Sequence, residues 1–208
     1  MDLDSSNGLN RKEREFLRHR GEILAASESV FSEKGYVSAT MEEIAQRSEF
    51  AVGTLYKFFE NKADLYRETV LRRTILLEQV VVDAICEADG PSDKIQAYYW
   101  CRVELFWKHL PFHRIFLGGP LGTMSEADLQ LVSGSLERYD RMVAYVSGIF
   151  RDGIERGEFQ TLNPDLMVLA LEGILRAYFD QFCRLDDPVR DRNQEVQLFE
   201  LFMKGVSR

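Results

Sequence analysis

The segment from Thr40 to Lys62 carries side chains that suit contacts with a phosphate backbone and with base edges. Thr40 and Lys62 each stand at the expected start of a helix, where free backbone N–H groups favour an anion. Lys62 adds a positive charge there, and Tyr56 and Lys57 end in polar groups suited to phosphates. These residue types predict nucleic-acid binding at this segment.

Three helices are expected to position these groups. Residues 11–34 show the apolar spacing of a first, longer helix. Thr40-Met-Glu-Glu43 has the pattern of a capping box, which predicts that a second, short helix starts at Thr40. A break at residues 47–50 precedes a third helix over about residues 51–58. Two short helices joined by a tight turn behind a longer one predict a helix-turn-helix.

The third helix has the composition of a recognition helix. Val52 and Thr54 are small enough to reach base edges or thymine methyl groups. Gly53 permits close approach of the backbone to a duplex. Leu55 and Phe59 are expected on the opposite face, where they hold the helix against the core. The helix therefore presents one face to a ligand and one to its own domain.

Several stretches of this segment resemble the N-terminal signature of TetR-type regulators: Thr40-Met-Glu-Glu-Ile-Ala45, Gly53-Thr-Leu-Tyr56, Phe59 and Asn61-Lys62-Ala-Asp-Leu65. The resemblance covers the first quarter to third of the chain, whereas the remainder is similar to the family only in length and helical pattern. It implies phosphate contacts from Thr40, Tyr56 and Lys62, and base contacts from the start of the third helix. The predicted DNA-binding residues are Thr40, Ala51, Val52, Gly53, Thr54, Tyr56, Lys57 and Lys62.

Several positions depart from that signature. The family usually has Ala-Gly-Val-Ser where this chain has Ser48-Glu-Phe-Ala51. Glu49 therefore replaces the turn glycine, and a positive φ at such a residue costs about 1 kcal/mol or more. Ala51 lacks a capping hydroxyl, and Phe58 replaces a His or Tyr. These changes reduce the number of expected phosphate contacts and leave the predicted fold unchanged.

The charge distribution predicts few phosphate contacts. The net charge is −8, and residues 1–62 hold nine Lys or Arg against eleven Asp or Glu. Phosphate contacts are local, so the sign of the whole chain does not exclude DNA binding. We expect weak non-specific affinity and a small number of well-placed contacts.

Composition and spacing predict a globular all-α chain. Apolar spacings of three and four recur, strand alternation is nearly absent, and only five prolines occur. Residues 1–62 are predicted to form the helix-turn-helix DNA-binding domain, and residues 63–208 a helical ligand-binding and dimerisation domain. The later helices are expected over about 61–87, 93–110, 125–157, 164–185 and 190–204. Asn61 is expected to cap the first of these, and Asn163-Pro164 to start the fourth with proline at its first position.

The same composition predicts a cytoplasmic protein. No basic segment precedes an apolar stretch at the N-terminus, and no run of about 18 apolar residues occurs, so neither a signal peptide nor a membrane span is expected. The three cysteines are odd in number and far apart, which indicates reduced thiols.

The last two helices are predicted to form a dimer interface. A dimer reads two half-sites about 34–36 Å apart, which a single helix-turn-helix cannot do. Small residues on the first of these helices permit close helix approach, and apolar residues on the second add surface. The predicted interface comprises Leu166, Ala170, Gly173, Ala177, Val196, Phe199, Phe202 and Met203. The alternative is that both helices only cover their own domain.

Aromatic residues gather in the middle helices and predict an apolar ligand pocket, with core packing as the alternative. The predicted pocket residues are Tyr99, Arg102, Val103, Phe106, His109, Phe116 and Tyr178. His109 and His113 have the spacing of a zinc-binding pair, but Pro111 interrupts the helix between them and no third ligand is evident. We therefore expect no metal and no cofactor.

Together these features predict a homodimeric transcriptional repressor that binds a near-palindromic operator and is released by a small, hydrophobic effector. A helical enzyme is a rival hypothesis, but the sequence lacks G-x-x-x-x-G-K-[ST], Cys-x-x-Cys and H-E-x-x-H motifs, so no enzymatic activity is expected. A protein-binding adaptor is the other rival. It would need the last two helices but not Gly53, Thr54 and Tyr56 in that order.

Overall fold

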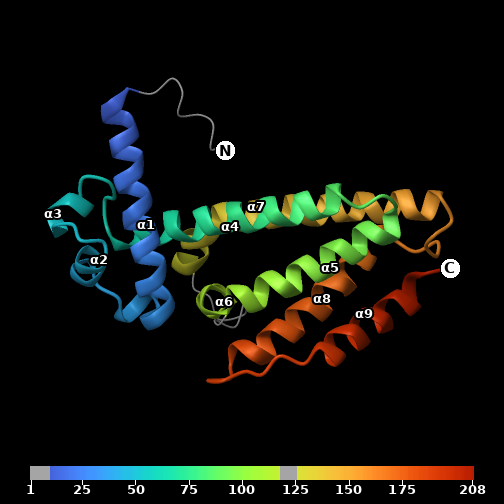
Figure 1. The fold of residues 1–208 in the computed structure, drawn as a ribbon. Coiled ribbons are helices and arrows are strands. Elements are labelled where there is room, and N and C mark those ends of the chain that lie inside the picture. The colour runs from blue at the N-terminus through green and yellow to red at the C-terminus, as the bar shows by residue number, and fades with distance from the viewer. Residues whose placement is uncertain (1–9, 118–125) are drawn as a thin grey trace. The chain divides into compact units, whose positions relative to one another are not determined.

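The computed structural model describes residues 10–117 and 126–208, and it describes side chains in these ranges except those of residues 115–117 and 126–133. Nine α-helices and no strand occur within these ranges, which confirms the predicted all-α fold (Figure 1). The chain divides into two compact units, the first ending at Arg72 and the second beginning at Arg73. No helix in the described ranges is both long and apolar enough to cross a membrane.

The first unit contains α1 (Arg11–Ser38), α2 (Met41–Arg47), α3 (Val52–Leu55) and the beginning of α4 (Lys62–Cys86) (Figure 1). Gly35 interrupts the helical geometry near the end of α1 with a φ of 74°. This left-handed conformation costs glycine little because it has no Cβ. The core of the unit is formed by fully or almost fully buried apolar side chains: Ile23, Val30, Phe31, Ile44, Leu55, Phe59 and Leu65.

The second unit contains the rest of α4 and five further helices: α5 (Pro91–Lys108), α6 (Leu110–Leu117), α7 (Glu126–Glu155), α8 (Pro164–Cys183) and α9 (Arg192–Val206). Helix α8 packs against α5, α6, α7 and α9, and Figure 1 shows α5, α8 and α9 running side by side. Pro164 occupies the first turn of α8 and Asn163 caps that helix, as the sequence predicts.

Helix α6 was not expected, because Pro111 was interpreted as a helix stop. In the structure α5 ends at Lys108 and α6 begins at Leu110, so that Pro111 lies in the first turn of a new helix. A proline is tolerated there because the backbone N–H it lacks has no partner within the helix. His113 is consequently part of α6. The glycine-rich stretch 118–122 lies outside the described residues.

A buried carboxylate fastens α9 to the rest of the second unit. Glu195 is fully buried and accepts hydrogen bonds from Trp107 Nε1 at 2.9 Å and from the Tyr178 hydroxyl at 2.7 Å. Arg190 Nε donates to the same carboxylate at 2.8 Å and supplies the compensating charge. A charge buried in this way is stable only when it is paired and hydrogen-bonded.

Candidate nucleic-acid interface and effector cavity

The start of α2 has the predicted capping box. The Thr40 hydroxyl accepts from the backbone N–H of Glu43 at 3.2 Å, and the Glu43 carboxylate accepts from the backbone N–H of Thr40 at 3.2 Å. Thr40 itself is exposed. The capping interaction therefore fixes the first turn of α2 while leaving its N-terminus accessible to a ligand.

The turn between α2 and α3 contains the one strained backbone position expected from the sequence. Glu49 has a φ of 60°, in the region that usually requires glycine. Hydrogen bonds on either side hold the turn, from Ser48 Oγ to the Ile44 carbonyl at 2.8 Å and from the Phe50 N–H to the Ala45 carbonyl at 3.0 Å. The turn keeps its geometry without the glycine that relatives usually have.

Helix α3 presents its small residues outward. Leu55 is fully buried, Val52 and Thr54 are half-buried, and Gly53 is exposed. A Cβ added at Gly53 would meet no other atom within 4 Å, and the residue does not have a positive φ. Neither internal packing nor backbone geometry therefore requires glycine at this position.

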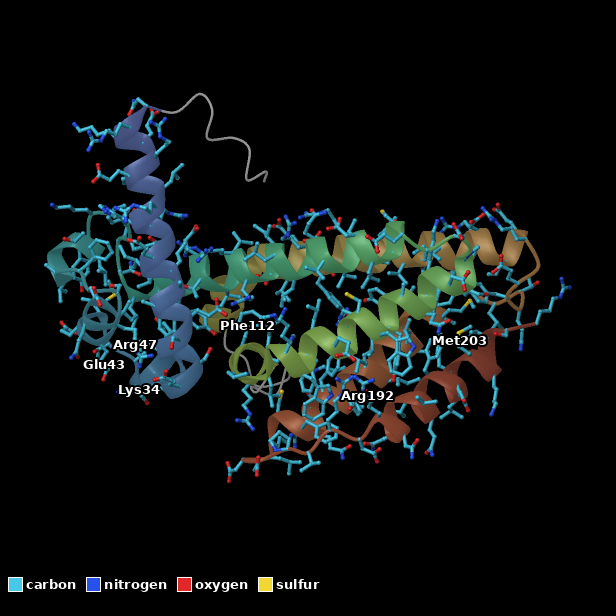
Figure 2. All side chains as sticks on the ribbon, viewed as in Figure 1. Lys34, Glu43, Arg47, Phe112, Arg192 and Met203 are labelled. Atoms are coloured by element: carbon cyan, nitrogen blue, oxygen red, sulfur yellow. The ribbon has the colours of Figure 1, made fainter. Side chains whose placement is uncertain are left out.

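Cationic side chains around α2 are largely neutralised within the first unit. Arg47 donates to both carboxylate oxygens of Glu33 at 2.8 Å, and Lys34 donates to Glu43 at 2.7 Å; Figure 2 shows Lys34, Glu43 and Arg47 together beside α2. Hydrogen bonds from Arg47 and Ser29 lower the pKa of Glu33 to about 2. These pairs reduce the positive field of the unit.

Tyr56 and Lys57 remain available beside α3. The Tyr56 side chain is 53% exposed. Lys57 is also exposed, and among the described residues it takes part in no ion pair. Lys57 is therefore the cation next to α3 whose charge is not already matched by a carboxylate.

Lys62 has a different environment from the one predicted. Its ammonium donates to the backbone carbonyl oxygens of Tyr36 at 2.9 Å, Val37 at 3.3 Å and Ala39 at 3.0 Å. These three bonds use the three hydrogens of the ammonium group. Lys62 thus ties the start of α4 to the link between α1 and α2. Its contact with phosphate stays a prediction.

Phe58, which departs from the family signature, packs against Phe16 of α1 with a distance of 4.6 Å between ring centroids. The Phe16 side chain is otherwise 48% exposed. The pair therefore joins the segment after α3 to the N-terminal half of α1. Sequence reasoning missed this contact because the two residues are far apart in the chain and each one alone has a plausible role in the core.

The second unit encloses a cavity of about 260 Å³ whose wall is mostly apolar. Helices α4, α5, α6, α7 and α8 contribute the lining: Thr74, Leu77, Glu78, Val81, Arg102, Leu105, Phe112, His113, Ser135, Leu136, Arg138, Tyr139, Met142, Glu172, Arg176 and Phe179. Arg102 is the predicted pocket residue found among them. The volume lies just below the usual range for small-molecule sites.

The other predicted pocket residues lie elsewhere. Tyr99, Val103, Phe106 and Tyr178 are buried in the core of the second unit and do not line this cavity. His109 is half-buried outside the lining, and the side chain of Phe116 lies outside the described residues. Most of the predicted aromatic set thus follows the alternative that the sequence left open, which is core packing.

The contacts made by α5 explain this difference. Tyr99, Val103 and Phe106 are spaced by four and three residues, so they share one face of α5. On that face the Tyr99 hydroxyl donates to the Glu195 carbonyl of α9 at 2.7 Å, and Phe106 stacks on Phe179 of α8 at 4.2 Å. Arg102, three residues from Tyr99 and four from Phe106, lies at the edge of this face and lines the cavity together with Leu105. The sequence does not show which part of the face packs against another helix and which part borders the cavity.

A buried polar network forms one side of the cavity. Glu172 of α8 accepts from the Tyr98 hydroxyl, from the Tyr139 hydroxyl at 2.9 Å, and from Arg102 at 3.2 and 3.4 Å. Arg102 also donates to the Tyr98 oxygen at 2.5 Å. Burial raises the pKa of Tyr98 well above its usual value, so its hydroxyl stays protonated and continues to donate. Sequence reasoning missed Glu172, because a single glutamate in an otherwise apolar helix is expected to be exposed to solvent.

The faces of α8 and α9 differ in how much of the predicted dimer interface they expose. On α8, Leu166 is 61% exposed, and Ala170, Gly173 and Ala177 are exposed along the same side. On α9, Val196 is 39% exposed while Phe202 is only 5% exposed. Phe199 and Met203 are half-buried against the core, where Phe199 packs on Tyr99 at 4.8 Å.

Phe202 therefore belongs to the core of its own chain, where its ring meets that of Phe150 at 6.0 Å. Its side chain is not available to a second copy in this conformation. The apolar side of α9 was expected to face outward as a whole. The hydrogen bonds that Glu195 accepts from residues of α5 and α8 instead orient part of that side toward the core.

Comparison with known proteins gives a coherent result. Residues 23–69 match the family model for bacterial regulatory proteins of the tetR family. The chain is 28% identical over 191 residues to the HTH-type transcriptional regulator YhgD of Bacillus subtilis, a match that covers 89% of this chain and 95% of the relative. It is 39% identical over 101 residues to the HTH-type transcriptional activator FasR of Mycolicibacterium smegmatis, covering 49% of this chain and 42% of that one.

Solved structures extend the likeness beyond the matched N-terminal segment. The transcriptional regulator FadR from Bacillus subtilis, solved in complex with stearoyl-CoA, is similar with a TM-score of 0.76. That alignment covers 89% of this chain and 98% of the FadR chain at 20% identity. At this level of identity the comparison shows a shared fold.

Proposed function

Because the chain is a transcriptional regulator of the TetR family with a helix-turn-helix DNA-binding domain, we propose that it acts as a homodimeric repressor released by a small molecule. The observation that carries the DNA-reading part is the outward placement of Gly53 between Val52 and Thr54. These residues and Ala51 would enter the major groove of a near-palindromic operator.

Phosphate contacts in this proposal come from few groups. Thr40 offers the accessible N-terminus of α2, and Tyr56 and Lys57 offer an exposed hydroxyl and an unpaired ammonium. Lys62 contributes by holding the link between α1 and α2, because its hydrogens already donate to three carbonyl groups. With so few cations free, specific binding depends on two copies of the chain.

The proposed dimer uses the exposed sides of α8 and α9. Leu166 and Leu169 are 61% and 67% exposed, which is unusual for two leucines close together on one helix. The small residues Ala170, Gly173 and Ala177 beside them allow a second helix to approach closely. A two-fold axis through such a surface gives an isologous interface and matches the symmetry of a palindromic operator.

The effector would bind in the cavity of the second unit. Helix α4 begins with Lys62 in the first unit and supplies Thr74, Leu77 and Val81 to the cavity wall. A ligand that binds one arrangement of α4 more tightly than another would shift the population of DNA-competent dimers. The stearoyl-CoA complex of the FadR neighbour supports control by a ligand in this fold.

Selection of binding sites from random DNA, followed by fluorescence titration of the selected duplex, tests the proposal. We expect a two-fold symmetric site bound more tightly than bulk DNA by about 1000-fold or more at moderate salt. Thr54→Ala and Val52→Ala should each change the preferred sequence, whereas Tyr56→Phe should weaken all sequences alike. Equal affinity for every duplex would exclude the repressor function.

Activation is a second candidate, because the relative that is 39% identical over about half of this chain is an activator. A reporter gene placed behind the selected operator separates the two roles. A repressor lowers expression when the chain is present, and its effector restores it. An activator raises expression from the same operator.

A further inference from the structure

The positive charges around the cavity are already matched by carboxylates of the same chain. The Arg102 guanidinium lies 3.2 Å from Glu172, which is nearly buried. The other arginines of the lining also have acidic partners, Arg138 pairing with Glu78 and Arg176 with Asp180. No lysine lines the cavity among the described residues.

Glu172 is itself saturated by its neighbours. Its two oxygens accept hydrogen bonds from Tyr98, Tyr139 and Arg102, so each oxygen of the carboxylate already has partners within the chain. A carboxylate or phosphate brought into this space would have to break an existing pair or remain unpaired. Either alternative is costly for a charge removed from water. The cavity therefore disfavours an anionic ligand.

His113 differs from the other polar residues of the lining, each of which has a hydrogen bond or an ion pair within the described residues. Both of its ring nitrogens are buried, and neither has a hydrogen-bond partner among the described residues. The ring lies among Phe106 at 5.3 Å, Phe112 at 5.6 Å and Phe179 at 6.1 Å, and it forms part of the cavity lining. A buried polar group without a partner costs stability, so a ligand that supplies the partner recovers that cost.

The protonation state of His113 defines what such a partner must be. Burial, with the nearby charge of Arg102, lowers the pKa of His113 to about 3, so the ring is neutral at physiological pH. A neutral imidazole has one nitrogen that donates and one that accepts. A hydroxyl group pairs with either of them, since it both donates and accepts, whereas a carbonyl group pairs with the N–H alone.

We propose that the cavity binds an uncharged, largely apolar molecule whose hydroxyl group hydrogen-bonds to the His113 ring. This proposal rests on the ligand-controlled function proposed above. The apolar wall formed by residues such as Leu105, Phe112 and Met142 buries the body of this molecule. The Arg102–Glu172 network closes one side of the cavity and excludes charged analogues. Selectivity for neutral alcohols over acids of the same shape follows from these two features.

Three probes of one shape test this selectivity with the full chain: 2-naphthol, 2-naphthoate and naphthalene, measured by calorimetric titration at neutral pH. We expect 2-naphthol to bind at least about 10-fold more tightly than 2-naphthoate, and several-fold more tightly than naphthalene. Equal or tighter binding of the carboxylate overturns the proposal. So does an absence of 2-naphthol binding to the folded chain.

Two variants assign the selectivity to the named residues. His113→Phe keeps the aromatic volume and should lower 2-naphthol affinity about 5- to 10-fold while leaving naphthalene affinity unchanged. Glu78→Gln leaves Arg138 without its carboxylate and should raise 2-naphthoate affinity relative to 2-naphthol. Unchanged 2-naphthol affinity in His113→Phe overturns the hydrogen bond to His113, and unchanged selectivity in Glu78→Gln overturns exclusion by paired charges.

The outcome is independent of the DNA experiment. Titration of the probes needs no operator, so a failed selectivity leaves the repressor proposal standing. The converse outcome is an operator whose binding no cavity ligand alters, whatever the charge of that ligand. That result would exclude ligand control of DNA binding, while the titrations would still test the selectivity of the cavity. Thermal unfolding of each variant shows that the fold is retained during these measurements.

Discussion

The Lys62 ammonium lies 4.7 Å from the centre of the Tyr36 ring and donates to the carbonyl oxygen of the same residue at 2.9 Å. This contact closes a loop between the end of α1 and the start of α4. A lysine that reads from the sequence as a phosphate ligand is thereby a structural link. The two roles make opposite predictions about salt.

Replacing Lys62 with Met should destabilise the chain by about 1–3 kcal/mol, because three carbonyl groups lose their donor. Operator affinity should fall, but the dependence of log K on log salt concentration should keep its slope. Chemical denaturation and titrations at several salt concentrations provide both values. A slope that becomes less negative by about 0.9 would instead identify a direct phosphate contact.

Lys57→Met is the matched control for that measurement. Lys57 is exposed and unpaired, so its removal should leave stability unchanged within about 0.5 kcal/mol. The slope of log K against log salt concentration should then become less negative by about 0.9, since one phosphate contact is lost. Identical slopes for Lys57→Met and the unmodified chain would remove Lys57 from the interface.

Gly53→Ala should separate stability from DNA binding. The added methyl group meets no atom of the chain within 4 Å, and alanine favours a helix over glycine by about 1 kcal/mol. We expect a higher Tm together with operator affinity at least about 10-fold lower, because the duplex needs that space. Gly21→Ala, which also has open space around its Cβ, should raise Tm without this loss. Unchanged operator affinity in Gly53→Ala would show that no surface approaches there.

Glu195→Ala should cost about 3–5 kcal/mol of stability, since it leaves Arg190, Trp107 and Tyr178 without their buried acceptor. Urea unfolding followed by tryptophan fluorescence measures this directly, as Trp107 is one of the partners. Glu195→Gln retains an acceptor oxygen and should lose less. A cost below about 1 kcal/mol for the alanine variant would mean that α9 is held by apolar packing alone.

His113 should make the chain less stable in mild acid. Its pKa is near 6.5 when unfolded and about 3 when folded, so the unfolded chain binds the extra proton as pH falls below 6.5. The contribution to stability is therefore complete above pH 6.5 and is lost between that value and pH 3, at up to about 1.4 kcal/mol per pH unit. The difference in unfolding free energy between the unmodified chain and His113→Phe should change with this slope. A constant difference over that range would contradict a buried neutral ring.

Gly173→Glu should convert the proposed dimer to a monomer. The position is exposed with open space around its Cβ, so the fold tolerates the side chain while a close helix partner does not. Sedimentation velocity should show half the mass, and operator affinity should fall about 100-fold or more. Gly148→Glu on α7, also open around its Cβ, is the control. A Gly173→Glu variant that remains dimeric would place the interface elsewhere.

Local signals account for what the sequence predicted well. Thr40, Asn61 and Asn163 cap the helices that follow them, and each cap is visible as a residue type at a fixed offset from the helix start. The positive φ of Glu49 was likewise predictable from its place in the turn. Pro111 misled because a proline that ends one helix is equally able to begin another.

Tertiary contacts account for what could not be predicted. Nothing near Lys62 in the sequence indicates that three carbonyl groups of the α1–α2 link will surround it. The cavity shows the same limit, because Phe106 and Arg102 are four residues apart on α5 and only their neighbours decide which one meets empty space. The burial of Phe202 depends on how Glu195 orients α9, which no local pattern records.

The conformation of Glu49 limits how far the DNA-reading segment can be transplanted. Helices of seven and four residues are too short to be stable alone, and the turn between them holds a residue whose φ of 60° costs energy. Contacts with α1, among them the Phe16–Phe58 pair, must therefore stabilise the two short helices and the turn between them. A chimera that grafts residues 40–62 onto another scaffold should lose its shape unless α1 is transferred with them.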